Sequence, residues 1–266
     1  MKTVREKRER LAAVAAALTG LYPDAVCALR WEGDPWRLLV MGRLSAQCTD
    51  ARVNLVSEKL FRAYPTPAAM AAAPLTDIEA LVKSCGLYHT KAANIRDASA
   101  MLVAEYGGEL PRTMEELLRL PGVGRKIANL LLGDVFGQPA VVTDTHCIRI
   151  CGRLGMYPEG ERDPYRVEKV LTGLLDPAGS ADFCHRIVQF GRDFCTARAP
   201  RCAACPLAAA GLCEKYERDR RRAGKHPDAP SGKTGGKPRA AASGKAGATR
   251  TKKEGKRGAP WRIRSD

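Results

Sequence analysis

The sequence predicts an all-α fold, and three observations lead to this prediction. Ala and Leu are abundant while aromatic residues make up only 6% of the chain, a composition that favours helix. Apolar residues recur at three- and four-residue spacing in segment after segment, which is the period of an amphipathic helix. Convincing alternation of apolar and polar residues, the sign of a strand, is absent. A chain of 266 residues is long enough to bury a sizeable core in one or two compact units.

The predicted helices follow one another as far as about Tyr216. The first is an amphipathic helix over the alanine-rich stretch 11–18. Thr76 and Thr113 each stand three residues before a glutamate, which is the spacing of a capping box, and Asp163 precedes a proline at the first helical position. The helical periodicity continues over 36–47, 51–61, 75–82, 89–106, 126–136, 145–154 and 183–194.

The end of the chain differs in composition from the rest. From Glu217 to Asp266 there are 16 Lys and Arg against 5 Asp and Glu, whereas the other 216 residues carry 28 against 24. Most of the net charge of +15 therefore belongs to this segment. Its Gly, Ala, Pro and Ser offer too little apolar surface to offset the entropy of ordering. We expect a disordered basic tail over 217–266, and a polyanion is the partner that its charge favours.

No stretch of the sequence approaches the roughly 20 apolar residues that a membrane span requires. Basic residues ahead of the segment 11–18 imitate a signal peptide, but Glu6 and Glu9 interrupt them and the apolar stretch is mostly alanine. We therefore expect a cytoplasmic protein whose thiols stay reduced. For this reason its 10 cysteines do not predict a disulfide framework.

The most informative motif is a hairpin sequence between two apolar helical stretches, Leu120-Pro121-Gly122-Val123-Gly124-Arg125-Lys126. Such a hairpin points backbone N–H groups outward, where they can hold a phosphate. Gly122, Val123 and Gly124 are therefore candidate DNA-binding residues. Lys126 is a candidate amine nucleophile, and Asp144, eighteen residues later, is its candidate partner. A grip on the DNA backbone, an amine and a carboxylate together suggest base excision.

Each member of this pair also has a plainer interpretation. Lys126 could be a surface lysine that contacts phosphate, and Asp144 could be the N-cap of a helix that begins near Thr145. Capping and catalysis are compatible, because helix N–H groups hold a carboxylate ionised and oriented. The joint occurrence of the two residues in this motif favours catalysis.

Four cysteines lie close together near the end of the expected folded part, with gaps of six, two and seven residues. A Cys-x-x-Cys pair flanked by two further thiols can surround one metal centre. The spacing alone leaves open whether that centre is zinc or a four-iron cluster. The four are Cys195, Cys202, Cys205 and Cys213. The other six cysteines have no such spacing, and we expect them to be small buried apolar residues.

Several motifs stand in the order of one known family: Leu44-Ser45-Ala46-Gln47-Cys48-Thr49-Asp50, Gly86-Leu87-Tyr88, the hairpin with Lys126, Val142-Thr143-Asp144-Thr145-His146 and Cys195-Thr196-Ala197-Arg198. This set resembles the endonuclease III family of helix-hairpin-helix DNA glycosylases. The resemblance covers about residues 1–216 and leaves out the tail. It implies a six-helix barrel domain over 28–138 and a second helical domain, from 1–27 and 139–216, that holds a [4Fe–4S] cluster. The lesion would lie in the cleft between them.

The resemblance also implies roles for matching residues. Lys126 corresponds to the nucleophile that attacks the sugar C1′ and forms a Schiff base, and Asp144 to the partner that stabilises charge on the sugar or assists deprotonation. Gln47 and Leu87 match positions that fill the gap left when the damaged nucleotide rotates out, as base flipping requires. We expect His146 to shape the site by hydrogen bonding. The four clustered cysteines would ligate the cluster, although the gap before Cys213 is two residues longer than the family's.

The resemblance therefore implies a base-excision repair enzyme, a bifunctional DNA glycosylase and AP lyase. It would remove oxidised pyrimidines and cleave the abasic site by β-elimination. Its partner would be double-stranded DNA with a damaged pyrimidine or an abasic site, and it would act as a monomer at the nucleoid. One alternative is a mismatch adenine glycosylase, which should lack the catalytic lysine and usually continues into another folded domain. Another is a non-catalytic helix-hairpin-helix DNA-binding protein, against which the lysine–aspartate pair argues.

Overall fold

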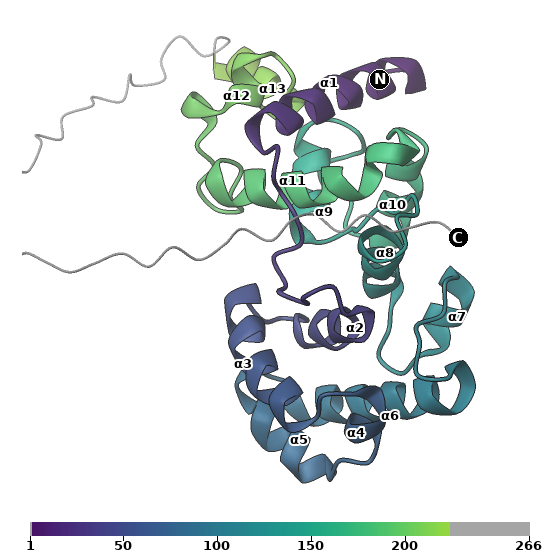
Figure 1. Cartoon of the computed structure of the whole chain (residues 1–266). Coiled ribbons are helices and arrows are strands. Elements are labelled where there is room, and N and C mark those ends of the chain that lie inside the picture. The colour runs from purple at the N-terminus through teal and green to yellow at the C-terminus, as the bar shows by residue number, and fades with distance from the viewer. Residues whose placement is uncertain (1, 224–266) are drawn as a thin grey trace, which may run out of the picture. The chain divides into compact units, whose positions relative to one another are not determined.

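The computed structural model describes residues 2–223, and within them the chain is built from helices without a strand (Figure 1). The all-α prediction is therefore confirmed. The α-helices are α1 (Val4–Leu21), α2 (Pro35–Leu44), α3 (Asp50–Ala63), α4 (Pro67–Ala71), α5 (Leu75–Val82), α6 (Tyr88–Tyr106), α7 (Met114–Arg119), α8 (Arg125–Asp134), α9 (Thr145–Arg153), α10 (Pro164–Thr172), α11 (Ser180–Asp193), α12 (Pro206–Ala209) and α13 (Glu214–Ala223). Short 3₁₀ helices occur at η1 (Lys83–Cys85), η2 (Pro177–Gly179) and η3 (Cys202–Ala204).

Two of the expected helix starts are built as the sequence suggests. Asp163 caps α10 by accepting hydrogen bonds from the first turn, and Pro164 takes the first helical position. Thr113 caps α7 by accepting from the backbone N–H of Glu116 at 3.3 Å, but the Glu116 carboxylate accepts from the Thr113 hydroxyl and not from its backbone N–H, so the expected capping box is only half formed. A short polar side chain satisfies an otherwise unpaired helix N–H in each case.

The capping box expected at Thr76 is wrong. Helix α5 begins at Leu75, two residues before the start that a Thr76 cap would give, with Pro74 in the N-cap position and no side chain capping it. The Pro74 carbonyl accepts the first hydrogen bond, from Ile78 N at 3.3 Å. Because the Pro74 carbonyl already accepts from the N–H groups of Asp77 and Ile78, the helix starts at Leu75 and Thr76 lies within its first turn.

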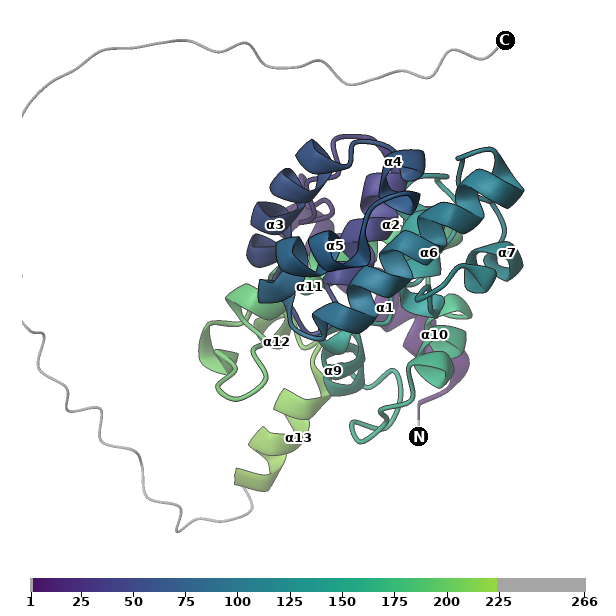
Figure 2. The same ribbon diagram turned by 90° about the horizontal axis from the view of Figure 1, so that it is seen from below.

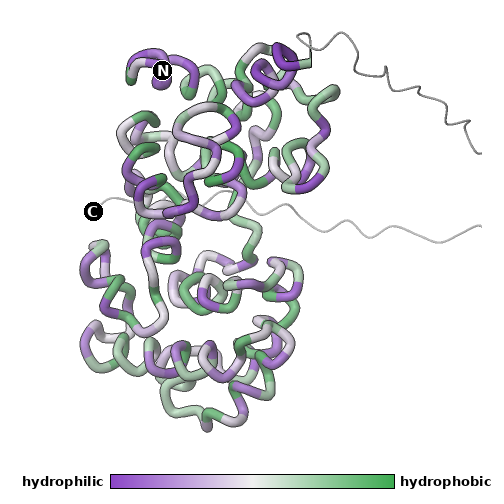
Figure 3. Tube along the Cα trace, turned by 180° about the vertical axis from the view of Figure 1, so that it is seen from behind, coloured by the Kyte–Doolittle hydropathy of each residue, from purple (hydrophilic) through white to green (hydrophobic). Residues whose placement is uncertain are grey.

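The described residues bury two hydrophobic cores. One draws its side chains from Leu29 to Ala140 and joins α2 to α8. The other joins α1, through Leu11, Val14 and Leu18, to segments between residues 141 and 207. In Figure 1, α2 to α7 gather around the first core and α1 and α9 to α13 around the second, with α8 between the two groups. The tube in Figure 3 shows that hydrophilic and hydrophobic residues are interspersed along the helices, which is the pattern of amphipathic helices.

The tail does not begin where its composition suggests. We expected disorder from Glu217, but α13 continues to Ala223 (Figure 2). Ion pairs explain the extra turns, because Arg218 reaches Glu159 at 2.6 Å and Glu217 reaches Arg10 of α1 at 3.8 Å. The rest of the expected disordered tail, 224–266, lies outside the described residues. Among the described helices, none combines the length and the apolar character that crossing a membrane requires.

Candidate active site

The hairpin between α7 and α8 requires glycine at one position and leaves its backbone open at another. Gly122 has a φ of +77°, and a Cβ there would lie 2.7 Å from the Arg43 and Asn94 side chains. Gly124 is the N-cap of α8, and a Cβ built on it would meet nothing within 4 Å. No side chain caps α8. The first N–H groups of this helix are therefore available to an anion, as the motif predicts. Val123 is buried and anchors the hairpin to the first core.

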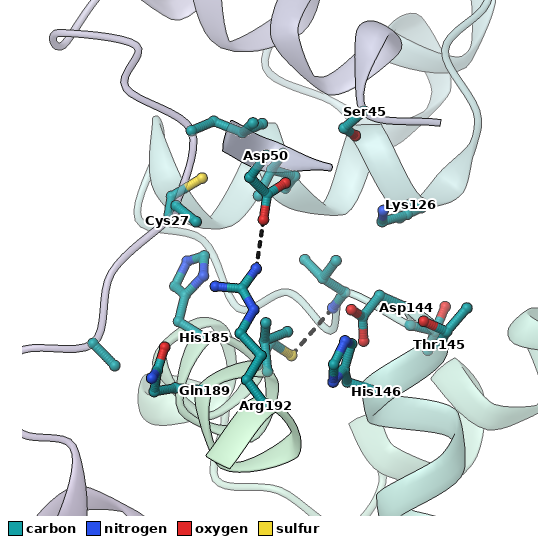
Figure 4. Close-up of a pocket in the computed structure, with 18 of the residues that line it drawn as sticks. Cys27, Ser45, Asp50, Lys126, Asp144, Thr145, His146, His185, Gln189 and Arg192 are labelled. Atoms are coloured by element: carbon teal, nitrogen blue, oxygen red, sulfur yellow. Dashed lines mark hydrogen bonds and ion pairs between the residues drawn. The ribbon is translucent and has the colours of Figure 1, made fainter. Parts of the chain in front are cut away.

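Lys126 and Asp144 come from different elements and line one cleft of about 1960 Å³. Lys126 is exposed in the first turn of α8. Asp144 is the N-cap of α9, and its Oδ1 accepts from Cys147 N at 2.7 Å. The capping interpretation of Asp144 is thus confirmed, and the hydrogen bond fixes the carboxylate at the cleft. Figure 4 shows the lysine amine and the carboxylate approaching the same part of the cleft.

His146 lies next to Asp144 in the cleft (Figure 4). Its Nδ1 is 3.1 Å from a guanidinium nitrogen of Arg149. Burial is the main cause that lowers the pKa of His146, and the Arg149 charge adds to it, although Asp144 opposes both. A lowered pKa keeps the imidazole neutral at neutral pH, which suits a hydrogen-bonding residue better than a cationic one. The same Arg149 donates twice to the carbonyl of Cys195, which links α9 to the clustered cysteines.

Three polar pairs connect helices of the first core with helices of the second core. Arg125 binds Glu168 of α10 through two hydrogen bonds, at 2.5 and 2.9 Å. This role makes Arg125 a scaffold residue. The other two pairs were missed by our sequence reasoning. Arg192 of α11 reaches Asp50 of α3 at 2.5 Å (Figure 4), and His185 reaches Asp134 at 2.7 Å. Only Asp50 lay in a motif that could have drawn attention to it.

The two expected intercalating residues share an unusual backbone conformation. Gln47 and Leu87 have φ values of +54° and +49°, and among the described non-glycine residues only Glu32 joins them in this region. A non-glycine residue in this region costs about 1–3 kcal/mol and persists only where the surrounding structure holds it. Both side chains are exposed, with 59% of Leu87 accessible to solvent. Leu87 therefore lies on the surface and is not part of either hydrophobic core.

The four clustered cysteines line a single cavity beside α9 and α11. All four are partly buried. Apolar side chains, among them Phe190 and Leu207, complete the wall. Arg153 donates to the Cys195 sulfur at 3.2 Å, as a cation would toward a thiolate. No three His, Cys, Asp or Glu side chains of residues 2–223 are grouped so as to hold one metal ion.

The long gap before Cys213 is taken up by a helical turn. Residues Pro206–Ala209 form α12, whose first hydrogen bond runs from Ala209 N to the Cys205 carbonyl. Gly211 then turns the chain with a φ of +69°. The two additional residues are accommodated in this way, and Cys213 still reaches the cavity.

The remaining six cysteines agree with the expectation of small apolar residues only in part. Four are fully buried, whereas Cys27 and Cys48 are only half-buried. Burial raises the pKa of Cys27 to about 12, with Asp134 adding to the shift. Burial also raises the pKa of Cys85 to about 11, and the neighbouring Cys48 contributes.

Comparison with known proteins assigns the chain to a family. Residues 40–177 match the HhH-GPD superfamily of base excision DNA repair proteins. Endonuclease III of Bacillus subtilis (strain 168) is 43% identical over 202 residues, which cover 76% of this chain and 90% of that protein. A solved non-covalent endonuclease III–DNA complex has a TM-score of 0.74 and 39% identity, over 83% of this chain and all of that one.

A trapped endonuclease III–DNA covalent intermediate matches equally well, with a TM-score of 0.74, 39% identity and coverage of 83% of this chain and 100% of that chain. The segment that matches the family model contains the hairpin, Lys126 and Asp144 of this chain. The chain is a member of the endonuclease III family, within the HhH-GPD superfamily of base excision DNA repair proteins.

Proposed function

We propose that this protein removes oxidised pyrimidines from duplex DNA and cleaves the resulting abasic site by β-elimination, with Lys126 as the nucleophile. One observation carries the proposal: an exposed lysine on α8 and a fixed aspartate at the start of α9 line the same large cleft. The solved structures that this chain matches include a trapped covalent intermediate of endonuclease III with DNA. The presence of Lys126 argues against the mismatch adenine glycosylase alternative, which should lack this lysine.

The proposed reaction uses an amine and a carboxylate, and it releases two leaving groups, the damaged base and the 3′ phosphate. The Lys126 amine bonds to C1′ as the bond between C1′ and the base breaks, and the base leaves with a proton. Transfer of a proton from this nitrogen to O4′ breaks the bond between C1′ and O4′ and opens the sugar ring, which gives a protonated Schiff base and a free hydroxyl group. Removal of a C2′ proton then breaks the bond from C3′ to oxygen and releases the 3′ phosphate. The Asp144 carboxylate stabilises the positive charge that develops on the sugar.

Other residues of the proposed site bind DNA. The open backbone at Gly124 and the adjoining hairpin residues Gly122 and Val123 grip a phosphate at the α8 N-terminus. Gln47 and Leu87 occupy the space vacated when the damaged nucleotide leaves the stack. We retain the expected division into a barrel domain over 28–138 and a second domain from 1–27 and 139–216. The two hydrophobic cores support it.

We further propose that the four clustered cysteines ligate a [4Fe–4S] cluster. In such a cluster each thiolate binds a different iron, whereas a single zinc ion takes all four thiolates. The four cysteines line one cavity, and the chain belongs to the endonuclease III family; both observations support the cluster. When bound, the cluster would stabilise the fold of the second domain, and Arg149 and Arg153 would hold its Cys195 segment against α9.

Borohydride trapping on a duplex with one oxidised thymine tests the proposed nucleophile. Lys126→Gln should abolish covalent trapping and strand cleavage while lesion binding persists, because an amide cannot form the imine. Lys169→Gln is the matched control, since it removes the same charge from an exposed position on α10. If Lys126→Gln still traps at the wild-type yield, Lys126 is not the nucleophile.

A further inference from the structure

Lys91 is a fully buried lysine, with 0% of its surface accessible to solvent. It lies in the first turn of α6, four residues after Leu87. Taking an ammonium group out of water is costly unless hydrogen bonds compensate it. A buried lysine therefore needs an explanation in terms of what it binds.

All three donors of the Lys91 ammonium group meet backbone carbonyls. Its Nζ lies 2.9 Å from the carbonyl of Leu44, 2.7 Å from that of Ala46 and 2.7 Å from that of Cys85. An ammonium group has three donors and no acceptor, so this set satisfies it completely. The Leu44 carbonyl also ends α2, where the helix dipole favours a positive charge.

The carbonyls belong to the two segments that carry the intercalating residues. Ala46 directly precedes Gln47 in the loop between α2 and α3, residues 45–49, which we call the Gln47 loop. Cys85 ends η1 and begins the turn to Leu87, within residues 83–87, which we call the Leu87 loop. One cation thus binds both loops, although its contacts are 45 and 6 residues away along the chain.

These bonds act on the dihedral angles that are strained. The carbonyl of Ala46 defines the peptide plane before Gln47, and rotation of this plane relative to Cα of Gln47 is its φ angle. The backbone N–H of Lys91 donates to the Leu87 carbonyl at 3.0 Å, which fixes the plane after Leu87. Strained conformations persist where neighbouring contacts over-determine them. The Lys91 ammonium group supplies such a contact to each loop, at Ala46 and at Cys85, whereas the backbone bond to Leu87 does not depend on the side chain.

We infer that Lys91 is a positioning residue that holds Gln47 and Leu87 at a fixed separation and orientation, so that both enter the duplex together. The inference rests on the proposed role of these two side chains in base flipping. Without the ammonium group, both loops can relax to ordinary backbone angles. The side chains would then no longer meet the gap in the stack, while Lys126 and Asp144 keep their places on α8 and α9.

The test separates insertion into the duplex from chemistry. A duplex carries a tetrahydrofuran abasic-site analogue opposite 2-aminopurine, whose fluorescence rises when it is unstacked. Wild-type protein should raise the fluorescence, and Lys91→Met should bind the duplex with little of this rise. In single-turnover assays, Lys91→Met should slow excision of an oxidised thymine from duplex roughly ten- to a hundredfold, the scale of a small misplacement. Cleavage of an abasic site in single-stranded DNA, which needs no wedge, should stay at the wild-type rate.

Control variants distinguish positioning from loss of charge or of fold. Lys169→Met removes a positive charge from an exposed position on α10, away from both loops, and should behave as wild type. Active protein is counted by borohydride trapping on the single-stranded abasic site. If Lys91→Met does not fold, Lys91→Gln keeps two donors and carries the same comparison. In a Leu87→Ala background, the Lys91 substitution should have a smaller effect on excision than in wild type.

Two results would overturn the inference. An equal loss on duplex and single-stranded substrates would make Lys91 a residue for folding alone. A full fluorescence rise with Lys91→Met or Lys91→Gln would show that the wedge is held without the cation. Failure of the wild-type protein to excise oxidised thymine would instead contradict the proposed function. The fluorescence comparison would still decide the role of Lys91, because it involves no bond cleavage.

Discussion

Replacing Gly122 with alanine should destabilise the protein, whereas the same change two residues later, at Gly124, should not. At Gly122 the backbone has a φ of +77°, and the new Cβ would lie 2.7 Å from the side chains of Arg43 and Asn94. At Gly124 φ is −102° and the added atom would meet nothing within 4 Å. The two positions therefore differ in strain and in available space within one hairpin.

The expected cost can be worked out from these contacts. Placing alanine in the left-handed region costs about 1–2 kcal/mol. Displacing the hydrogen bond between Arg43 and Asn94, which is 2.9 Å long, costs a further 0.5–1.5 kcal/mol or so. Gly122→Ala should thus lower the free energy of unfolding by roughly 2–3 kcal/mol. At Gly124 alanine is a poorer N-cap but restricts the unfolded chain, so the net change should stay within about 1 kcal/mol.

Urea unfolding followed by circular dichroism, together with binding of undamaged duplex, measures both effects. Gly124→Ala should keep the wild-type unfolding midpoint yet weaken DNA binding, because its methyl group covers the open backbone at the α8 N-terminus. Equal midpoints for the two variants would refute the packing argument at Gly122. Unchanged affinity in Gly124→Ala would refute the phosphate grip assigned to this helix end.

Four further outcomes are expected. Asp144→Asn should keep the α9 cap and the DNA affinity but lower the single-turnover rate roughly a hundredfold, because the amide lacks the stabilising charge; an unchanged rate would reduce Asp144 to a cap. Purified protein should be brown, absorb near 400 nm and hold about four iron atoms and no zinc; a colourless, zinc-loaded and fully active protein would contradict the proposed cluster. Cys205→Ser should mainly destabilise the second domain. The pKa of His146 is lowered by burial, so the unfolded chain binds more protons than the folded chain as the pH falls below about 6.5. The free energy of unfolding should therefore drop in that pH range. Urea unfolding at several pH values should show a smaller drop for His146→Gln than for wild type. Removal of residues 224–266 deletes 12 Lys and Arg and 3 Asp and Glu. If about four of these cations bind phosphates, the slope of log DNA affinity against log salt concentration should become smaller by roughly 3 to 4 in the truncated protein. Equal slopes for the full-length and truncated proteins would show that the segment does not contact DNA.

Local sequence signals were enough for the features that depend on neighbouring residues. Helical periodicity located most helices, since an amphipathic helix repeats its apolar positions every three or four residues. The capping role of Asp144 and the turn at Gly122 follow from a few consecutive residues, and both are present. The family motifs were also recognisable without a structure. One error was local, because Pro74 and not Thr76 precedes the first residue of α5. Another arose from distant contacts, because ion pairs to Glu159 and Arg10 hold α13 in a helix beyond Tyr216.

Only the tertiary structure decided which charged residues are buried and which are paired between the two cores. In the sequence, Lys91 is an ordinary polar residue near the start of a predicted helix, and nothing in the local pattern indicates that its ammonium group is surrounded by three carbonyls. Arg192 and Asp50 are 142 residues apart, and His185 and Asp134 are 51 apart. Periodicity and capping rules act over a few residues, whereas such contacts arise only when whole helices pack. The residues that support the site therefore had to be found in the folded chain.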